Sequence, residues 1–412
     1  MRASDDEIAV TGIGIVSPVG ADAPSTMSAL LRGGSGVRLL PPDQRDQAPV
    51  HLHAPVDDAG LTSIRPQERR RYDRSVLLAL QAAREAWRDA GSPDPEPARL
   101  ATVVSTGMGG LLTVFAGQEH YARKGYVGLP AYIVPGLMAN ASAAIIAAEF
   151  GAHAAAVSLS SACASSGDAL AHALGLFRAG EIDAAIVGGT EAILHPMTIS
   201  AFASLRALSS RHDEPERASR PFDRDRDGFV LGEGAAILVL ERARHAAARQ
   251  ARVWGRLLSA GITCDAGHLV APEPTGKWVA EAMRKALRSA GLTPSDVTFI
   301  SAHATATPPG DLAEWEAMKL AFGGSLADVS VTAVKSAIGH LIGAAGAVAT
   351  AVAIMSLKQG IVPPTQNLDN LDPAMDLDVI SGEPRPIDGG GTALINSSGF
   401  GGHNVAIAVA GH

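Results

Sequence analysis

A cysteine among small residues is the first feature of this sequence that could do chemistry. Cys163 follows a short β-favouring run at 157–159 and precedes a segment with apolar residues at helical spacing, Leu170, Ala173, Leu174 and Phe177. Unpaired N–H groups and the dipole at a helix N-terminus favour a thiolate over a thiol, so this position predicts an ionised nucleophile. Its small neighbours leave room for a substrate. The alternative is a buried cysteine that only packs, which is the commoner fate of cysteines.

Two histidines and a lysine lie in later segments that combine strand ends with small residues. His303 lies in SAHATATPPGD (301–311), and Lys335 and His340 lie in VKSAIGHLIGAAGAVA (334–349). A glycine-rich segment, INSSGFGGHN (395–404), has backbone N–H groups that can approach a ligand closely. A single histidine at a strand end more often has a structural than a catalytic role, and its spacing alone would place Lys335 on the surface. Because strand ends converge on a crevice in α/β sheets, the group together predicts one site.

A thiolate and two imidazoles suit acyl transfer followed by carbon–carbon bond formation. The thiolate would take an acyl group while nearby N–H donors hold the oxyanion. Two neutral imidazoles would donate hydrogen bonds to the carbonyl of a second thioester and stabilise the enolate formed as carbon dioxide leaves. Lys335 would supply a charge that orients the imidazoles.

Strand and helix patterns that alternate along the chain indicate an α/β protein. An opening strand is expected within residues 7–20, and a helix capped by Asp73 is expected to close at Ala90-Gly91. Further buried strands are expected at 100–104, 184–188, 235–240, 297–301, 329–334 and 393–396. These strands would fill two mostly buried sheets with helices between them.

Two pairs of similar segments suggest that the α/β unit is duplicated. Residues 87–107 resemble 287–305, and the helix end at 178–180 resembles that at 358–360. The two pairs occur in the same order, so the chain is expected to have an N-terminal half, 1–254, and a C-terminal half, 255–412.

Composition narrows the class of protein. The chain has 412 residues, a formal charge of −8 and two cysteines, which argues against nucleic-acid binding and against a disulfide framework. Its N-terminus is acidic where a signal peptide would be basic, and its longest apolar run, 342–355, is too short to span a bilayer. A cytoplasmic protein without a membrane anchor is therefore expected.

Two charged segments have a structural and a functional interpretation. PFDRDRDGFVLGEG (221–234) imitates a calcium-binding loop, but its twelfth position is Gly234 and no helix leads into it, so a turn held by Asp and Arg pairs is expected. Arg65, Arg69, Arg70 and Arg71 form a basic cluster that is either a solvated face or a docking patch for an acidic partner.

The combined motifs, SSACASSG, AHATAT, KSAIGH and NSSGFGGHN, resemble those of the β-ketoacyl-acyl-carrier-protein synthases, the elongating condensing enzymes of the thiolase superfamily. The likeness covers nearly the whole chain. PFDRDRDGFV, HLVAPEPTG and DLDVISGEPRP look closest to the long-chain branch that serves mycolate-type synthesis, although related enzymes also serve polyketide and polyene pathways. The resemblance implies a thiolase fold, in which duplicated βαβαβ halves pack as five layers, α-β-α-β-α.

The resemblance also implies roles for particular residues. Cys163 would carry the acyl group, with its own N–H and that of Phe400 as the oxyanion hole, while His303, His340 and Lys335 would serve decarboxylation. The remaining expected roles are the pantetheine contacts Thr305 and Thr307, the acyl-pocket residues Met108 and Phe202, the gate Phe400, a second mobile loop at 265–272, and the docking residues Arg65, Arg69, Arg70 and Arg206. The expected partners are an acidic acyl carrier protein and a second copy or a homologous subunit. No cofactor and no catalytic metal are expected.

The chain departs from the family pattern at several positions. Ala349 and Ser301 replace a Glu and an Asn that contribute to a structural cation site, so that site is expected to be weakened or absent and Lys335 to be held less firmly. Ala304 and Ala306 replace usual glycines. Ser398 replaces a Phe of the gating loop, which is expected to widen or re-polarise its surroundings.

Two other functions remain to be weighed against a condensing enzyme. A thiolase-like transferase acting on coenzyme A would need a second cysteine as a base in the C-terminal glycine-rich loop, where this chain has none, and Cys264 is expected to be packed or loop-bound. A non-catalytic subunit that shapes a partner's pocket would have lost the thiol, which this chain retains. The active half of a heterodimer in a polyene or polyketide pathway stays open.

Overall fold

The computed structural model describes residues 7–412. The first residues of the acidic N-terminus, 1–6, on which part of the expectation of no signal peptide depends, lie outside the described residues. Two small two-stranded sheets accompany one large sheet. The strands are β1 (Ile8–Val16), β2 (Arg38–Leu39), β3 (Leu52–His53), β4 (Leu100–Ser105), β5 (Ala155–Val157), β6 (Ala184–Glu191), β7 (Gly234–Arg242), β8 (Gly255–Cys264), β9 (Val297–Ser301), β10 (Ser330–Thr332), β11 (Ile361–Val362), β12 (Arg385–Pro386), β13 (Thr392–Gly399) and β14 (His403–Gly411).

The large sheet has ten strands in the order β10-β9-β13-β14-β8-β1-β7-β6-β4-β5. Its first five strands come from the C-terminal half of the chain and its last five from the N-terminal half. The prediction of two separate sheets is wrong in one respect, because Ile8–Val10 of β1 pair antiparallel with Gly255–Leu257 of β8 and join the halves edge to edge. β8 begins at Gly255, and the division of the chain at residue 254 stays a prediction.

Helices cover both outer faces and also fill the space between the halves. They are α1 (Ala23–Leu31), α2 (Pro42–Arg45), α3 (Pro66–Arg71), α4 (Arg74–Asp89), α5 (Leu111–Lys124), α6 (Ile133–Leu137), α7 (Ala141–Phe150), α8 (Ser165–Arg178), α9 (Pro196–Ser204), α10 (Ala243–Ala248), α11 (Lys277–Ala290), α12 (Pro308–Phe322), α13 (Lys335–Ile338) and α14 (Ala345–Gln359). As predicted, Asp73 caps α4, where its side chain accepts a hydrogen bond from the Ser75 N–H.

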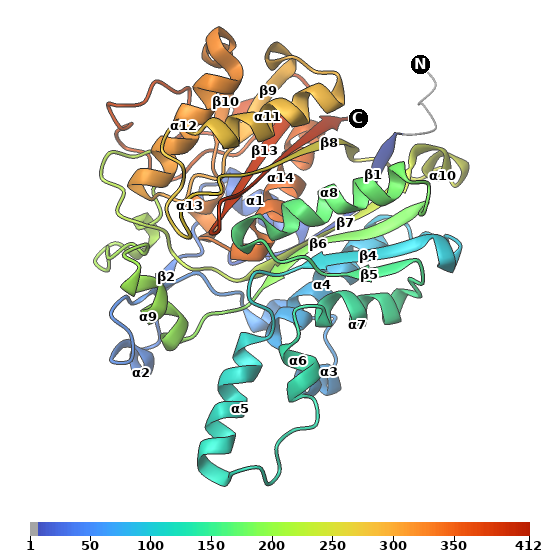
Figure 1. Ribbon diagram of the computed structural model, residues 1–412, viewed down its shortest axis with the longest axis vertical. Coiled ribbons are helices and arrows are strands. Elements are labelled where there is room, and N and C mark those ends of the chain that lie inside the picture. The colour runs from blue at the N-terminus through green and yellow to red at the C-terminus, as the bar shows by residue number, and fades with distance from the viewer. Residues whose placement is uncertain (1–6) are drawn as a thin grey trace.

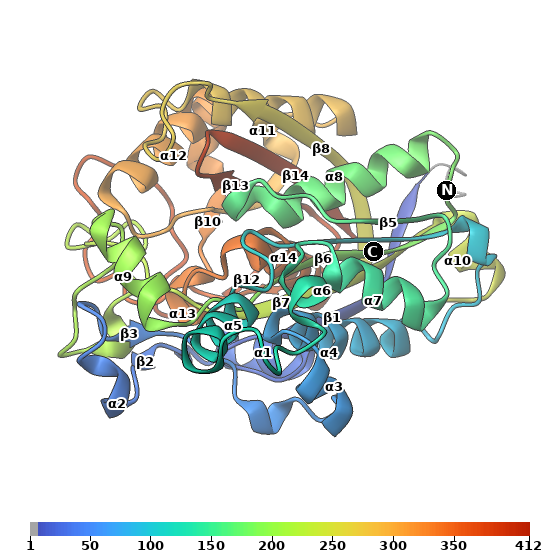
Figure 2. The same cartoon turned by 60° about the horizontal axis from the view of Figure 1, so that its bottom comes forward.

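Two helices form a central layer. α8 packs against β4 and β6 of one half and β8 and β14 of the other, and α14 packs against β7 and against β13 and β14. α4 and α7 cover the outer face of the N-terminal strands, and α11 and α12 cover the C-terminal strands (Figures 1 and 2). The result is the five-layer α-β-α-β-α arrangement of the thiolase fold.

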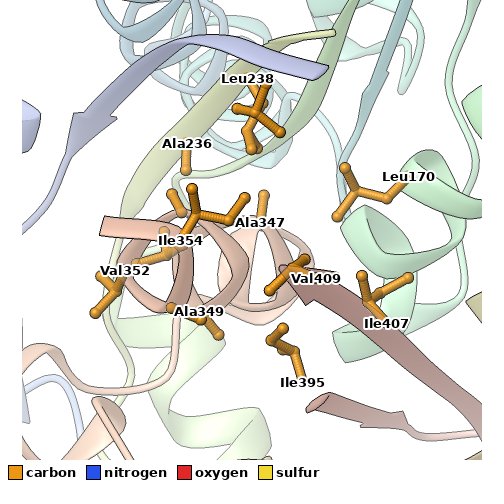
Figure 3. Packing of buried hydrophobic residues seen from close by; sticks show 14 of the residues in the cluster. Leu170, Ala236, Leu238, Ala347, Ala349, Val352, Ile354, Ile395, Ile407 and Val409 are labelled. Atoms are coloured by element: carbon orange, nitrogen blue, oxygen red, sulfur yellow. The ribbon is translucent and has the colours of Figure 1, made fainter. Parts of the chain in front are cut away.

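α14 shows why this layer is stable. It is apolar on every side, and its residues from Ala345 to Leu357 are all buried. In Figure 3, Ala347 and Ile354 lie on the side of Leu238 in β7, while Ala349 lies on the side of Ile395 in β13. With the preceding turn, α14 forms an 18-residue helical segment, Ile342–Gln359, longer than the apolar run in the sequence. It is long and apolar enough to cross a membrane, but 89% of it is buried within the protein, as in a core helix.

The segment that imitates a calcium loop is a turn held by Asp and Arg pairs, as predicted. Asp223 accepts the N–H groups of Asp225 and Asn370 and lies beside Arg220, at 3.1 Å. Arg226 pairs with Asp372 at 2.6 Å. Within residues 7–412, no group of three His, Cys, Asp or Glu side chains is arranged to bind a metal ion.

The central layer leads to a stability prediction. Ile354→Ala removes a fully buried side chain from the core of α14, so the apparent free energy of unfolding is expected to fall by about 2–5 kcal/mol. Urea unfolding followed by circular dichroism measures this change. Leu320→Ala on α12, where the side chain is 44% exposed, is the control and is expected to cost less than about 1 kcal/mol. Equal losses for the two variants would contradict the packing described.

Candidate active site

Three turns bring the predicted chemical groups to the same place. Cys163 lies in a short 3₁₀ turn, Ala162–Ala164, which follows β5 and leads directly into α8. His303 comes two residues after the end of β9, and His340 follows the short helix α13 after β10. Lys335 begins α13, so the prediction that a strand ends at this residue is wrong, since β10 already ends at Thr332.

The side chains of Cys163, His303 and His340 line one cavity of about 290 Å³. Thr305 and Thr307 line the same cavity, and their hydroxyl groups lie 3.0 Å apart. The other predicted residues on its wall are Phe202, Arg206, Ser398, Phe400 and, from the predicted mobile loop, Asp265, His268, Val270, Ala271 and Pro272.

The two imidazoles lie edge to face. Their ring centroids are 5.5 Å apart and their planes meet at 84°, and Phe229 contacts the His340 ring in the same manner at 5.2 Å. Burial lowers the pKa of both histidines well below the usual value, and the nearby Lys335 charge lowers it further. Nδ1 of each ring has no hydrogen-bond partner among residues 7–412. Both rings are therefore neutral at physiological pH and can each offer one N–H to a substrate.

A buried glutamate that the sequence analysis did not identify holds the His303 turn. Glu314 on α12 accepts the N–H groups of His303 and Ala304 at 2.8 and 2.7 Å, and Asn396 donates to it at 3.0 Å. Lys335 Nζ donates to the His303 carbonyl at 2.5 Å. This bond ties Lys335 to the His303 turn, and whether Lys335 is held less firmly than in relatives that keep the Glu stays a prediction. An acidic residue at a buried position of the helix that follows His303 was the signal available in the sequence.

The positive charge of Lys335 is disfavoured by burial. Burial lowers its pKa to about 8, although the nearby charge of Glu314 raises it. The side chain lies beneath the cavity rather than on its wall, since it is buried and does not line the cavity. Its charge acts on the surrounding groups and lowers the pKa of the Cys163 thiol.

Cys163 itself differs from the expectation. Burial raises the pKa of its thiol to about 12, outweighing the effect of the Lys335 charge and of the N–H groups of Phe400 and Cys163 that contact the sulfur. The prediction of an ionised resting thiol is therefore wrong, because burial destabilises the thiolate more than the N–H groups of the turn stabilise it. The same two N–H groups are the pair expected to hold an oxyanion.

The backbone around the sulfur is tightly packed. A Cβ on Gly399 would lie 2.4 Å from the Ser161 carbonyl and 3.1 Å from the Cys163 nitrogen, so only glycine lets this loop approach the cysteine. Ala306, which stands where the family usually has glycine, adopts a φ of +64°, a strained value for a residue with a Cβ.

Several predicted residues lie elsewhere. Met108 is 42% exposed and does not line the cavity. Arg65, Arg69 and Arg70 lie at α3, where Arg65 pairs with Glu68 at 2.5 Å and lines a separate cavity. Only Arg206, of the four predicted docking residues, stands at the active-site cavity.

The expectation that Cys264 is packed or loop-bound is wrong. It is the last residue of β8, is exposed, and pairs in register with His403, so its sulfur lies 3.8 Å from the Gly401 carbonyl. Cys264 thus lies beside the glycine-rich loop, although it is far from that loop in sequence, because β8 and β14 are antiparallel neighbours. Cys264 does not line the cavity that holds Cys163.

The charge of Lys335 leads to a pH prediction. Lys335→Met removes a charge that lowers the pKa of the thiol, so alkylation of Cys163 by iodoacetamide is expected to slow several-fold below about pH 8. Above pH 8 the native lysine loses its proton, and the two rates should converge. Peptide mass spectrometry in a Cys264→Ser background measures the rates. Equal rates at pH 7 would contradict the assignment.

Comparisons with known proteins agree with this geometry. The sequence matches the β-ketoacyl synthase N-terminal domain over residues 5–246 and the C-terminal domain over residues 254–369. It is 41% identical over 407 residues to "3-oxoacyl-[acyl-carrier-protein] synthase 2" of Mycobacterium tuberculosis, covering 97% of this chain and 96% of that protein.

Two solved structures have the same fold. "The ishigamide ketosynthase/chain length factor" matches with a TM-score of 0.89 at 29% identity, and a type II PKS acyl-carrier protein in complex with its ketosynthase matches with a TM-score of 0.88 at 28% identity. Each match covers 98% of this chain and 99% of the other. With a thiol and two neutral imidazoles in one buried cavity of this fold, the chain belongs to the β-ketoacyl synthase family.

Proposed function

We propose that this protein is a β-ketoacyl-acyl-carrier-protein synthase that extends an acyl chain by two carbons through decarboxylative condensation with malonyl-carrier protein. The observation that carries the proposal is the meeting of Cys163, His303 and His340 on the wall of one cavity, with the side chains of Cys163 and His340 buried. The mycobacterial relative named 3-oxoacyl-[acyl-carrier-protein] synthase 2 supports the same reaction.

The first step is acyl transfer to Cys163. The sulfur attacks the carbonyl carbon of an acyl-carrier thioester, a new carbon–sulfur bond forms, and the bond to the carrier's thiol breaks. The N–H groups of Cys163 and Phe400, which contact the sulfur, are placed to stabilise the oxyanion of the tetrahedral intermediate. The released carrier thiol leaves with the proton that the cysteine gives up.

The second step makes the carbanion and the carbon–carbon bond. His303 and His340 donate hydrogen bonds to the thioester carbonyl of malonyl-carrier protein, and these bonds strengthen as the enolate forms and carbon dioxide leaves. The carbanion attacks the acyl carbon on Cys163, and the carbon–sulfur bond breaks. The thiolate then regains a proton. Neutral rings suit this role because each must donate an N–H without protonating the carbanion.

The carrier's pantetheine arm fits the polar side of the cavity. Thr305 and Thr307 offer hydroxyl groups on the wall, and Phe400 and Phe202, whose rings lie 6.4 Å apart, border the acyl side. Arg206 lines the same cavity and is placed to meet an acidic carrier protein. The proposal needs no cofactor of the protein's own, since the arm arrives with the substrate.

A dimer is the expected assembly. β5 is an edge strand of the large sheet, and the segment around α5 and α6 projects from the body in Figure 1. This segment carries exposed apolar side chains, among them Val114, Tyr121, Tyr126, Val127, Tyr132, Val134 and Met138. Such a surface suits a second copy of the chain or a homologous subunit. The structural relative described as a ketosynthase/chain length factor keeps a heterodimer open.

The thiolase-like alternative has less support. Cys264 lies next to the glycine-rich loop but outside the cavity that contains Cys163 and both histidines, so it is not placed to act as a base on a bound substrate. A non-catalytic role has no support either, because the thiol is present together with the groups that would serve it.

Loading of the cysteine tests the proposal directly. Incubation with an acyl-carrier-protein thioester is expected to acylate Cys163, and addition of malonyl-carrier protein should then release a 3-ketoacyl product. Intact-mass and peptide mass spectrometry follow both steps, and Cys264→Ser should behave as the wild type. Acylation at Cys264 alone, or no acylation at all, would contradict the proposed function.

A variant separates the two half-reactions. Cys163→Gln imitates the acylated cysteine but cannot carry an acyl group, so condensation is expected to fall by more than about 10³-fold while malonyl thioester is still decarboxylated. Release of carbon dioxide and formation of acetyl-carrier protein measure decarboxylation. Condensation that continues in this variant would show that another residue is the nucleophile.

A further inference from the structure

A second buried carboxylate, Glu191, lies at the end of β6 and plays no part in the reaction described above. It is fully buried, and both of its oxygens accept hydrogen bonds. Oε1 accepts from the Thr106 hydroxyl at 2.9 Å and the Met108 N–H at 3.3 Å. Oε2 accepts from the Gly107 N–H at 2.8 Å and the Gly343 N–H at 2.9 Å.

These donors belong to two turns that support the reacting groups. Gly343 comes three residues after His340, in the 3₁₀ turn Ile342–Ala344 that leads into α14. Gly107 lies in the turn after β4, and its carbonyl accepts a hydrogen bond at 3.2 Å from Ser160, three residues before Cys163. Through Glu191, the His340 turn of one half of the chain is therefore joined to the Cys163 turn of the other.

The two turns are tightly packed against each other and against Glu191. A Cβ on Gly107 would lie 2.7 Å from Glu191 Oε2, and a Cβ on Gly343 would lie 2.3 Å from the Gly107 nitrogen. Between His340 and Gly343, Ile342 adopts a φ of +39°, which is unfavourable for a β-branched residue. Its side chain packs in the same apolar cluster as Cys163. A conformation of this kind persists only where its surroundings hold it.

We propose that Glu191 is a positioning residue for the condensing reaction, which holds the His340 turn against the Cys163 turn so that the carbanion forms within reach of the acyl-cysteine. The proposal rests on the proposed function. Glu191 does not line the cavity, so it acts through the two turns rather than on the substrate.

The carboxylate also acts on the thiol by its charge. Burial raises the pKa of Glu191 to about 7, and its negative charge raises the pKa of Cys163. The positive charge of Lys335 acts on the thiol in the opposite sense. The groups that contact Glu191 directly are three backbone N–H groups and one hydroxyl group, and none of them is charged.

Two substitutions separate the hydrogen bonds from the charge. In Glu191→Gln, the amide oxygen can still accept both the Gly107 and the Gly343 N–H, while the amide NH₂ can donate to the Thr106 hydroxyl, so the two turns stay joined without the charge. The Met108 N–H, whose contact with the carboxylate is the longest of the four at 3.3 Å, loses its acceptor. Glu191→Ala removes both the charge and the hydrogen bonds that link the two turns. Glu85 provides a matched control, because it accepts the Ile15 and Ala23 N–H groups at 2.9 and 2.7 Å and burial raises its pKa to about 7, yet it does not line the active-site cavity.

The expected result for Glu191→Ala is an uncoupled enzyme, in which malonyl-carrier protein is decarboxylated without condensation. Glu191→Ala should still load an acyl group and decarboxylate malonyl-carrier protein, whereas kcat for condensation falls by roughly 100-fold, as expected for a small misplacement of reacting groups. KM should be unchanged, and the ratio of carbon dioxide released to 3-ketoacyl product should rise. Glu191→Gln should restore condensation to within about threefold of the wild type.

The charge gives a second readout that does not depend on substrate. Above pH 7, where Glu191 is ionised, Cys163 of Glu191→Gln should be alkylated by iodoacetamide faster than the wild type, because the pKa of its thiol is lower. Below pH 6 the two rates should coincide. Glu85→Ala should lower the unfolding temperature without changing the alkylation profile or the ratio of carbon dioxide to product.

The outcomes distinguish the two proposals. Wild-type protein that forms no 3-ketoacyl product contradicts the proposed function itself. An active wild type together with a Glu191→Ala variant that stays coupled contradicts only the positioning role. A Glu191→Gln variant as uncoupled as Glu191→Ala also overturns it, as does an uncoupled Glu85→Ala, since general destabilisation would then explain the loss.

Discussion

The burial of the reactive side chains is the constraint on which the rest of the site depends. Cys163, His340 and Lys335 are each less than a tenth exposed, and burial is the largest influence on the pKa of all three and of His303. The same loss of water that keeps the thiol protonated also keeps the imidazoles neutral. In this environment a hydrogen bond to a developing enolate or oxyanion is stronger than it would be in water.

Such burial is possible because the site lies where the two halves of the fold meet. α8, which starts just after Cys163, and α14, which starts just after His340, lie between the strands of both halves. Each half supplies groups that the other lacks: the thiol comes from the first, and the histidines and the lysine come from the second. α14 forms an apolar layer of the core between the halves, and Ala349 is part of that layer.

Carboxylates supply much of the internal support. Glu314 holds the His303 turn by its backbone N–H groups and offsets part of the desolvation of Lys335. Asp311, three residues earlier on α12, accepts the N–H groups of Phe222 and Ala306 in the same manner. In each case a buried charge is matched by several backbone donors, the arrangement in which a buried carboxylate is tolerated. The turns that carry the reactive groups are thereby held in conformations that the backbone alone would not keep.

The sequence by itself determined the chemical inventory. The motifs contain the thiol, the two histidines, the lysine and the glycine-rich loop, and these residue types indicate the chemistry. The alternation of strands and helices, with two repeated segments, predicted the duplicated fold. The strands at 297–301 and 235–240 lie where the apolar runs placed them, because periodicity is a local property of the chain.

Only the tertiary structure decided how these groups behave. The neutral state of Cys163, the bond from Lys335 to the His303 carbonyl, the exposure of Cys264 and the support from Glu314 all depend on the tertiary structure. A pKa depends on the water and charge around a group. That environment exists only when β1 pairs with β8 and the central helices close over the site, so it could not be read from the order of residues.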